Sequence, residues 1–459
     1  MKINKKEIIT KSKYEIRDVI HGLVLRTPLE VKIINTPIFQ RLRRISQLAM
    51  ANLVYPGAHH SRFEHSLGTM HIAGKISERL KEDGHLIDRD IEVIRLAALL
   101  HDIGHGPFSH VSEHLLECYY DKEKVDIGKV REKIHELVTF SIIKNNRELG
   151  TLISSGNREM ILEILQRKKV KDFKSDIVTG PLDADKLDYL LRDNYHTGVK
   201  YGLFDLEKII ESMRVISEGK ETYLGIDEEG IFALEQLIIA KYHMSAQVYF
   251  HRIRGITDSM IIRGIKLAIQ NGLKEVERIY KYDGTKEFIE RYCRYYDSNL
   301  MGLIIKKGDT YSQDIFRRLF ERRLFKLLHS QRLSEIEGAK LKDKYVNLKE
   351  EEKKELETKI GKKLRLAPEH VILHTIDLKN PVGRPQGLSI DDETILVRLR
   401  KGPSERIRDI KWSIFDFRGP YQNIELHVYA PYDKFNDLDD TTKEKAKKKI
   451  SDIIAKILY

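Results

Sequence analysis

The chain is poor in cysteine, proline and glycine, and it lacks long apolar runs. Only 2 cysteines occur in 459 residues, so we expect no disulfide framework and a reducing, cytoplasmic environment. With 11 prolines and 28 glycines, the composition excludes collagen-like and low-complexity chains. No apolar run approaches the ~20 residues that cross a bilayer, and residues 1–18 lack a signal-peptide stretch. We therefore expect a globular protein without a membrane partner, with room for several domains.

Charge and histidine are unevenly distributed along the chain. The net charge is +11, but residues 1–44 carry 11 Lys and Arg against 4 Asp and Glu, residues 321–459 carry 30 against 24, and residues 45–320 carry 40 against 42. Of the 18 histidines, 9 lie between His59 and His114. A basic surface that binds phosphate backbones gives no reason for histidines to gather. The histidine-rich stretch therefore indicates a chemical site.

The hydrophobic pattern predicts a mainly α protein with a smaller C-terminal α+β module. Apolar side chains recur at helical spacing in segments such as IEVIRLAALLHDIGH and PLDADKLDYLLRDNYH. Residues 338–364 are dominated by charge, and VILHTIDL, ILVRLR, WSIFDF and IELHVYA then resemble strands before a last amphipathic helical segment. We divide the chain into a basic N-terminal segment (1–44), a helical domain (45–320) and a charged helical linker with the α+β module (321–459).

The strongest motif is HDIGHGPFSH, which starts at His101 and Asp102 at the end of an apolar helix. Imidazole and carboxylate together suit a divalent metal, and metal ligation is a physical reason to bury them there. The two glycines predict a turn and a close approach of the backbone. Two further segments offer what a metal site would still need: SRFEHSLG, with Arg62 and His65, and the acidic helix DADKLDYLLRD at residues 183–193.

These three segments, in this order, resemble the HD-domain metal phosphohydrolases. With TPIFQRLRRISQLAMANLVYPGAHH before them and NYHTGV after them, they are similar to the deoxynucleoside-triphosphate (dNTP) triphosphohydrolases, in the branch of the sterile-alpha-motif-and-HD-domain dNTPase and its bacterial relatives. The resemblance implies a helical HD-domain phosphohydrolase body that hydrolyses a dNTP to deoxynucleoside and tripolyphosphate. It also implies one divalent metal ion, whether Mn, Fe, Mg, Zn or Ni. The implied metal ligands are His65, His101, Asp102 and Asp185.

The resemblance also implies roles around the phosphates and the nucleoside. His110 would protonate the leaving 5′-oxygen, since histidine has a suitable pKa, and His105, His135 and Arg62 would lie close to the triphosphate. At His135 the flanking match is thin, because Ile134 replaces the residue usual before it. An ordinary core histidine is the alternative for each of the three. The implied substrate-binding residues are Gln47, Leu48, Lys186, Tyr189, Asp193, Tyr249 and His251.

A regulatory nucleotide site between the subunits of a homotetramer is a further implication. Gln40 and Arg43 match the guanine-site pattern of the family, whereas Asn35 stands where the family has an aspartate. A carboxylate accepts both guanine N–H donors, and an amide offers one acceptor and one donor. Guanine selectivity is therefore open, while the basic segment 1–44 suits the phosphates of an activator.

Two other functions compete with the dNTP triphosphohydrolase. Another HD-domain phosphohydrolase, such as a nucleotidase or a cyclic-nucleotide phosphodiesterase, would use the same metal ligands but not the implied sugar pocket. A non-catalytic nucleic-acid-binding protein would account for the net charge of +11 and would bind with a steep salt dependence. It would not account for the metal ligands, so nucleic acid is a secondary partner in this interpretation.

Overall fold

The computed structural model describes residues 14–125, 133–166, 172–332, 348–378, 395–400, 403–410, 423–430 and 445. Two compact units can be distinguished. The first comprises Met1–Met244, Arg278–Ser298 and Ile390–Phe417, and the second comprises Ser245–Glu277, Asn299–Ser389 and Arg418–Tyr459. The expected WSIFDF strand and nearly all of the C-terminal amphipathic segment lie outside the described residues. Among the residues described, no helix combines the length and the apolar character that crossing a membrane requires.

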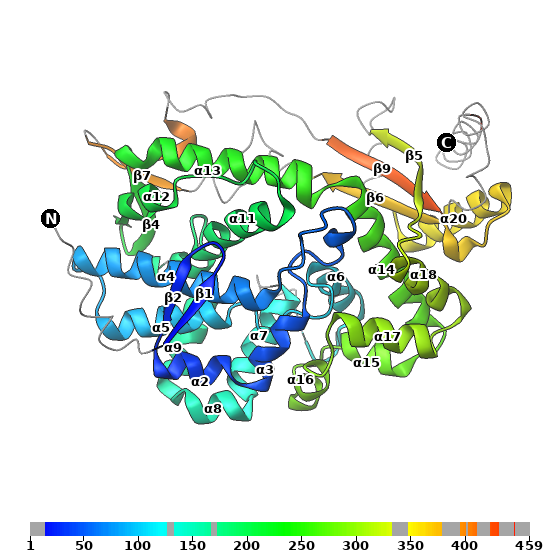
Figure 1. The fold of residues 1–459 in the computed structure, drawn as a ribbon, viewed down its shortest axis with the longest axis horizontal. Helices are drawn as coiled ribbons and strands as arrows, with labels where there is room; N and C mark the ends of the chain where they lie inside the picture. Colours follow the sequence, from blue (N-terminus) through cyan, green and yellow to red (C-terminus); the bar gives the residue numbers. More distant parts are fainter. Residues whose placement is uncertain are drawn as a thin grey trace. The chain divides into compact units, whose positions relative to one another are not determined.

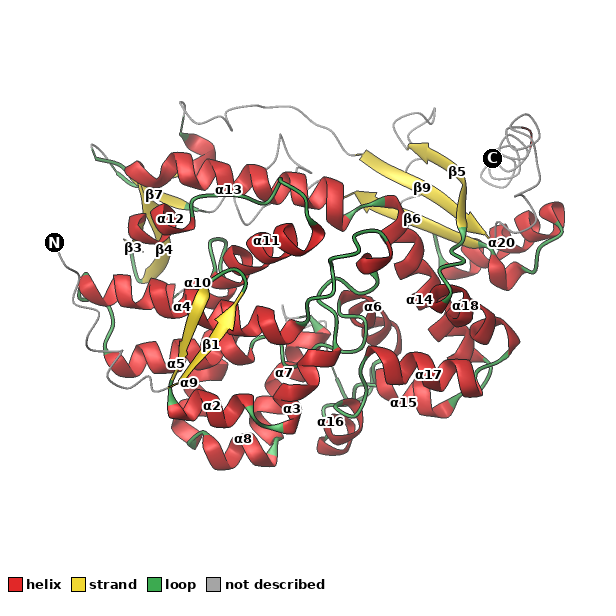
Figure 2. Cartoon of the chain, in the orientation of Figure 1, coloured by secondary structure: helices red, strands yellow, loops and turns green. Residues whose placement is uncertain are grey.

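The first unit opens with a β-hairpin (Figures 1 and 2). Strands β1 (Tyr14–Asp18) and β2 (Gly22–Arg26) pair antiparallel, with Asp18 opposite Gly22. Helix α2 (Pro28–Ile34) follows at once, because Thr27 and Glu30 form a capping box at its start. The short helix α3 (Pro37–Gln40) then leads into the helical body.

Helices α4 (Arg62–Glu82), α5 (Asp88–Leu100) and α11 (Ala184–Thr197) form the centre of the first unit. Helix α4 packs against both α5 and α11, and its apolar side chains, Met70, Ile72 and Ile76 among them, are fully buried. Because α4 begins at Arg62 and α5 ends at Leu100, their chemistry-bearing residues sit at helix ends. The mainly helical fold expected from the sequence is confirmed.

The remaining described elements of the first unit surround this centre. They are α6 (His110–Tyr119), α7 (Ile134–Asn145), α8 (Arg147–Leu152), α9 (Ser155–Leu165), α10 (Phe173–Thr179), α12 (Leu206–Ser212), α13 (Ile231–Met244) and α16 (Lys286–Tyr292). A four-stranded sheet has the order β3-β4-β7-β8, built from β3 (Met213–Glu218), β4 (Glu221–Asp227), β7 (Leu396–Arg398) and β8 (Glu405–Arg406). Strand β7 runs parallel to β4, so a segment of the predicted C-terminal module completes this sheet.

The second unit contains helices and a three-stranded antiparallel sheet. A π-helical turn (Ser245–Tyr249) precedes α14 (Arg252–Gln270), which packs against α18 (Thr310–Phe320). The long apolar stretch is thus interrupted between Met244 and Arg252, and Gly255 lies within α14.

The sheet of the second unit has the order β5-β9-β6, from β5 (Lys326–Arg332), β9 (Asn423–Ala430) and β6 (Ile372–Leu378). Strands β6 and β9 are the ones expected at VILHTIDL and IELHVYA. Helix α20 (Glu350–Leu364) belongs to the same unit. Helices α15 (Lys274–Tyr280) and α17 (Asp297–Lys307) span the limits between the two units. The small sheet-containing C-terminal region is therefore confirmed.

Candidate active site

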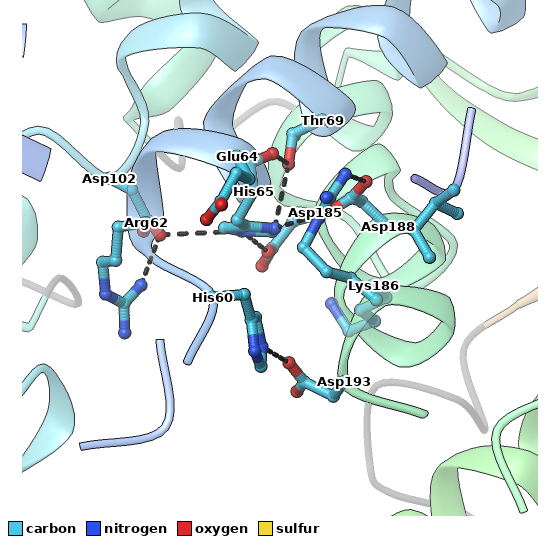
Figure 3. Close-up of polar contacts among 12 residues, drawn as sticks. His60, Arg62, Glu64, His65, Thr69, Asp102, Asp185, Lys186, Asp188 and Asp193 are labelled. Atoms are coloured by element: carbon cyan, nitrogen blue, oxygen red, sulfur yellow. Dashed lines mark hydrogen bonds and ion pairs between the residues drawn. The ribbon is translucent and has the colours of Figure 1, made fainter. Parts of the chain in front are cut away.

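His65, His101 and Asp185 come together from α4, the end of α5 and α11, and Figure 3 shows His65 beside Asp185. The Nε2 atom of His65 lies 2.9 Å from Oδ1 of Asp185, and Nε2 of His101 lies 3.7 Å from the same oxygen. Asp102 follows His101 directly, and its Oδ2 is 3.6 Å from Nε2 of His65. Two imidazoles and two carboxylates thus converge from α4, the end of α5 and the first turn of α11. This donor set suits a divalent metal ion.

The orientation of the two rings fits a metal. The Nδ1 atom of His65 donates to Oδ2 of Asp188 at 2.8 Å, and Nδ1 of His101 donates to the carbonyl oxygen of Ala98 at 2.7 Å. The Nε2 atoms of both rings are buried, and the groups beside them are the carboxylates of Asp102 and Asp185. A hydrogen bond at one ring nitrogen fixes the tautomer that leaves the other nitrogen free as a ligand. Both rings therefore direct an open ligand atom into the cluster.

The electrostatics of the cluster favour positive charge. Burial alone would lower the pKa of His65, but Asp185 and Asp188 outweigh burial and raise the pKa to about 10. Burial alone would raise the pKa of Asp185, yet contacts with His101 and His65 bring it below its usual range. The carboxylates that favour the protonated form of His65 would also attract a metal cation at the same place. The pocket is suited to a cation on this ground as well.

Arg62 connects the cluster of proposed metal ligands to the HDIGHGPFSH loop. Its guanidinium forms an ion pair with Asp102, and its Nε donates to Oγ of Ser109 at 2.8 Å. The third nitrogen, NH2, is buried without a hydrogen-bond partner. Because an unpaired buried donor is costly, this nitrogen is suited to a phosphate oxygen, which a guanidinium binds well.

Three histidines gather beside Glu113. The rings of His105 and His135 stack with centroids 4.3 Å apart, and the rings of His105 and His110 meet edge to face at 5.3 Å. Oxygens of Glu113 lie 3.4 Å from Nδ1 of His110 and 3.3 Å from Nδ1 of His135. The side chain of His110 is 57% exposed, whereas Glu113 is 11% exposed. The ring of His110 is thus exposed, and its Nδ1 atom contacts the largely buried carboxylate of Glu113.

The loop between α5 and α6 is shaped by unusual backbone conformations. Phe108 and Ser109 have φ values of 62° and 53°, a left-handed region that non-glycine residues rarely adopt. The amide of Phe108 donates to Asp297 at 2.7 Å, which helps to hold this turn. At Gly104 a Cβ would lie 2.4 Å from the amide nitrogen of Thr139. The close approach predicted for these glycines is confirmed, and strain at such a turn is typical of functional sites.

The residues expected to bind the sugar lie in the same unit. Gln47 and Leu48 are buried, and Oε1 of Gln47 has no hydrogen-bond partner. Asp193 is buried and accepts a hydrogen bond from Nε2 of His60 at 2.7 Å, as Figure 3 shows. Tyr189 lies on α11, four residues before Asp193.

The other expected substrate residues are arranged differently. Lys186 lies on α11, but its Nζ donates to Oδ2 of Asp183 at 2.7 Å and to the carbonyl oxygen of Gly180 at 2.8 Å. Tyr249 and His251 belong to the second unit, where Tyr249 ends the π-helical turn and His251 caps α14. Lys186 therefore already has partners within the first unit.

The residues expected at the regulatory site lie on the exposed side of the segment that follows α2. Asn35 is the exposed C-cap of that helix. The Nε2 atom of Gln40 donates to the carbonyl oxygen of Ile34 at 2.8 Å, and its Oε1 accepts from Nε of Arg43 at 2.8 Å. The guanidinium of Arg43 stacks over the ring of Phe63. Gln40 and Arg43 are thus brought together next to Asn35.

Four residues around the site were not assigned from the sequence: Asp188, Glu113, His60 and His21. Glu113 follows His110 by three residues, a spacing at which helical side chains meet, so this pair could have been found. Asp188 lies three residues after Asp185 on the same helix, but its use depends on His65, which is far away in the chain. His21 contacts Asp188 across 167 residues of sequence, and no local pattern indicates that contact.

The chain is similar to known protein families and to a solved structure. A model of the HD domain matches residues 62–192, and a model of the HD associated region matches residues 204–445. A phosphohydrolase of Bacteroides thetaiotaomicron has the same fold, with a TM-score of 0.69 and 25% identity over 91% of this chain and 99% of its own.

Curated relatives include proteins of known and unknown activity. An uncharacterized protein of Methanocaldococcus jannaschii is 39% identical over 58% of this chain and 52% of its own length. The deoxynucleoside triphosphate triphosphohydrolase SAMHD1 of Gallus gallus is 29% identical over 68% of this chain and 55% of its own length. The chain thus spans about half the length of these relatives. It belongs to the family of HD-domain proteins in which an HD domain is followed by an HD associated region.

Proposed function

We propose that this protein hydrolyses dNTPs to deoxynucleoside and tripolyphosphate with the help of one divalent metal ion. One observation carries the proposal: the free Nε2 atoms of His65 and His101 point at the carboxylate of Asp185, next to a buried Arg62 whose NH2 has no partner. The triphosphohydrolase activity named for the SAMHD1 relatives supports the choice of substrate.

The proposed chemistry divides among the residues of the site. His65, His101, Asp102 and Asp185 would hold a divalent ion, which would supply Lewis acidity at the site. In the proposed reaction a water molecule attacks the α-phosphorus and gives up a proton. The bond from this phosphorus to the 5′-oxygen breaks, and the 5′-oxygen takes a proton as it leaves. The metal could be Mn, Fe, Mg, Zn or Ni, since this donor set suits several divalent ions.

His110 is the proposed donor of that proton. Its ring is exposed to an incoming substrate, and Glu113 contacts Nδ1, so the carboxylate orients the ring and stabilises its protonated form. Burial and the charge of Arg62 lower the pKa of both His105 and His110, so the choice of His110 as the donor rests on its exposed ring and its contact with Glu113. His135 and Arg62 complete the surroundings of the triphosphate.

The proposed nucleoside pocket uses Gln47, Leu48, Tyr189 and Asp193. The unpaired Oε1 of Gln47 can accept a hydrogen bond from the 3′-hydroxyl of a sugar, and the apolar Leu48 offers no partner to a 2′-hydroxyl. Buried polar groups left unpaired by a wrong substrate are an effective source of specificity. Lys186, Tyr249 and His251 are retained as proposed contacts with the phosphates and the base.

Regulation is a separate part of the proposal. Asn35, Gln40 and Arg43 would hold an activating nucleotide between the subunits of a homotetramer, and Asn35 makes a guanine base only one of several candidates. The test is an activity matrix of four dNTP substrates against each nucleotide as activator, with the oligomeric state measured in parallel. Activity that is independent of every added nucleotide would refute the proposed regulatory site and leave the proposed hydrolytic site unaffected.

The experiment for the hydrolytic site compares the wild type with Asp102→Ala. Each protein is incubated with the four dNTPs and Mn²⁺ or Mg²⁺, and anion chromatography identifies the products. Glu92→Ala is the matched control, because Glu92 is an exposed carboxylate on α5, the helix that ends beside His101. We expect tripolyphosphate from the wild type and the control and none from Asp102→Ala. Full activity of Asp102→Ala would contradict the assigned metal site.

A further inference from the structure

We propose that His21, in the turn of the N-terminal hairpin, is a positioning residue of the metal centre and acts through Asp188 on the ligand His65. The inference rests on the metal site of the proposed function and adds a residue that lies outside the HD motif. It also makes the β1–β2 hairpin a part of the site's support.

Asp188 has its hydrogen-bonding capacity filled by three side chains. Oδ1 accepts from Nε2 of His21 at 2.6 Å and from NH2 of Arg192 at 2.9 Å. Oδ2 accepts from Nδ1 of His65 and from Nε of Arg192, both at 2.8 Å. A carboxylate has about four lone-pair sites, so each donor holds one of them. The plane of this carboxylate, and with it the ring of His65, is therefore fixed from three directions.

The hairpin turn is built to present His21 to this carboxylate. Oδ1 of Asp18 accepts from the amides of Ile20 and His21 at 2.9 and 3.0 Å, and Gly22 completes the turn with a φ of 71°. Oδ2 of Asp18 accepts from NH1 of Arg192 at 2.9 Å. Asp18 thus shapes the turn and at the same time anchors the arginine that shares Asp188 with His21.

The surroundings of His21 leave the ring little freedom. Its side chain is 4% exposed, and its ring lies against that of His71 on α4, with centroids 5.2 Å apart. At the other end of the hairpin, the carbonyl oxygen of Leu25 accepts from Arg95 at 2.9 Å. Arg95 belongs to α5, the helix that ends beside His101. The hairpin is therefore held against the helices that supply the proposed ligands.

Loss of the imidazole would leave Oδ1 of Asp188 with one donor and an unfilled space beside it. The carboxylate could then turn, and Nδ1 of His65 would lose the partner that selects its tautomer. Removing a group that orients a metal ligand typically weakens metal binding by ~10–100-fold. Because His21 acts one step further away, we expect the lower end of that range.

The experiment measures the affinity of the full chain for Mn²⁺ by isothermal titration calorimetry. His21→Ala removes the contact. His21→Gln keeps an amide nitrogen at nearly the position of Nε2, and His21→Asn carries the same amide on a side chain too short to reach. Val19→Ala is the matched control, since Val19 lies in the same turn and is 59% exposed. We expect binding ~10-fold weaker in the Ala and Asn variants and close to wild type in the Gln and Val19 variants.

Each outcome decides between the inference and the function on which it rests. If the wild type binds Mn²⁺ and the Ala and Asn variants bind it equally well, the role of His21 is refuted and the metal site stands. If the wild type does not bind the ion, the proposed function fails first. Should His21→Ala not fold, the comparison of Gln with Asn still decides. Equal weakening by Gln and Asn would indicate a structural role only and would overturn the inference.

Discussion

Gly68 is a position at which one methyl group should damage the site. Gly68 is buried in α4, and a Cβ built there lies 1.8 Å from Oδ1 of Asp188 and 2.5 Å from NH2 of Arg192. Carbon atoms normally approach such neighbours no closer than ~3.5 Å. We therefore expect Gly68→Ala to push the carboxylate of Asp188 away from His65.

The expected magnitude follows from opposing effects. An alanine in a helix is favoured over glycine by ~1 kcal/mol. Overpacking of a core costs about 1–3 kcal/mol, and disruption of a buried charge pair costs about 3–5 kcal/mol. The unfavourable effects dominate, so the free energy of unfolding should fall by at least roughly 3 kcal/mol. Metal affinity should fall in the same variant.

Urea unfolding of the metal-free protein, followed by circular dichroism, measures the change. Gly302→Ala is the matched control, because Gly302 lies in α17 and a Cβ there meets nothing within 4 Å. The control should gain up to ~1 kcal/mol. If Gly68→Ala were as stable as the wild type and bound Mn²⁺ equally well, the tight packing of Asp188 against α4 would be refuted.

Three other predictions concern pH, the HDIGHGPFSH loop and metal removal. Burial is the main reason why the pKa of His71 is lowered to about 3. The unfolded chain therefore binds more protons than the folded chain between pH ~3 and ~6.5, so stability should fall as the pH is lowered through that window, by up to ~1.4 kcal/mol per unit. The charged groups that also act on His71 are His21, Arg95, Lys75 and Asp18. His71→Gln should reduce the dependence of the free energy of unfolding on pH, measured by urea titrations at several pH values. An unchanged pH dependence would contradict the role of His71 in acid destabilisation. Gly104→Ala should displace α7 at Thr139 and lower kcat through His135, whereas unaltered kcat would mean that the loop adapts. Chelation by EDTA should abolish hydrolysis and lower the melting temperature, since a ligand at ~100 times its Kd contributes about 2.7 kcal/mol; an unchanged melting curve would argue against a tightly bound ion.

The sequence predicted the helical body because its apolar side chains recur at helical spacing. It also predicted the strands β6 and β9, whose alternating and β-branched residues are typical of strands. The sequence did not predict which strands pair with one another. Strand β7 runs parallel to β4 across about 170 residues of chain, and no local pattern specifies such a register.

The candidate site was predictable where its chemistry lies in short motifs. His65, His101 and Asp185 come from three motif segments, and the folded chain brings their ligand atoms within 4.8 Å of one another. The supporting contacts were not predictable, because His21 and Asp188 meet only through tertiary packing. The contact of Lys186 with Asp183 is local, since the two residues lie three apart on one helix turn, and it could have been predicted from the sequence. His21, which contacts Asp188, lies outside the three motif segments.

The most direct test of the central claim is the identity of the products formed in ¹⁸O-labelled water. The protein, loaded with Mn²⁺, is incubated with a dNTP, and mass spectrometry follows both products. The account predicts equal amounts of deoxynucleoside and tripolyphosphate, with the label in the tripolyphosphate because water attacks the α-phosphorus. Release of pyrophosphate or of single phosphates, or a label in the deoxynucleoside, would contradict it.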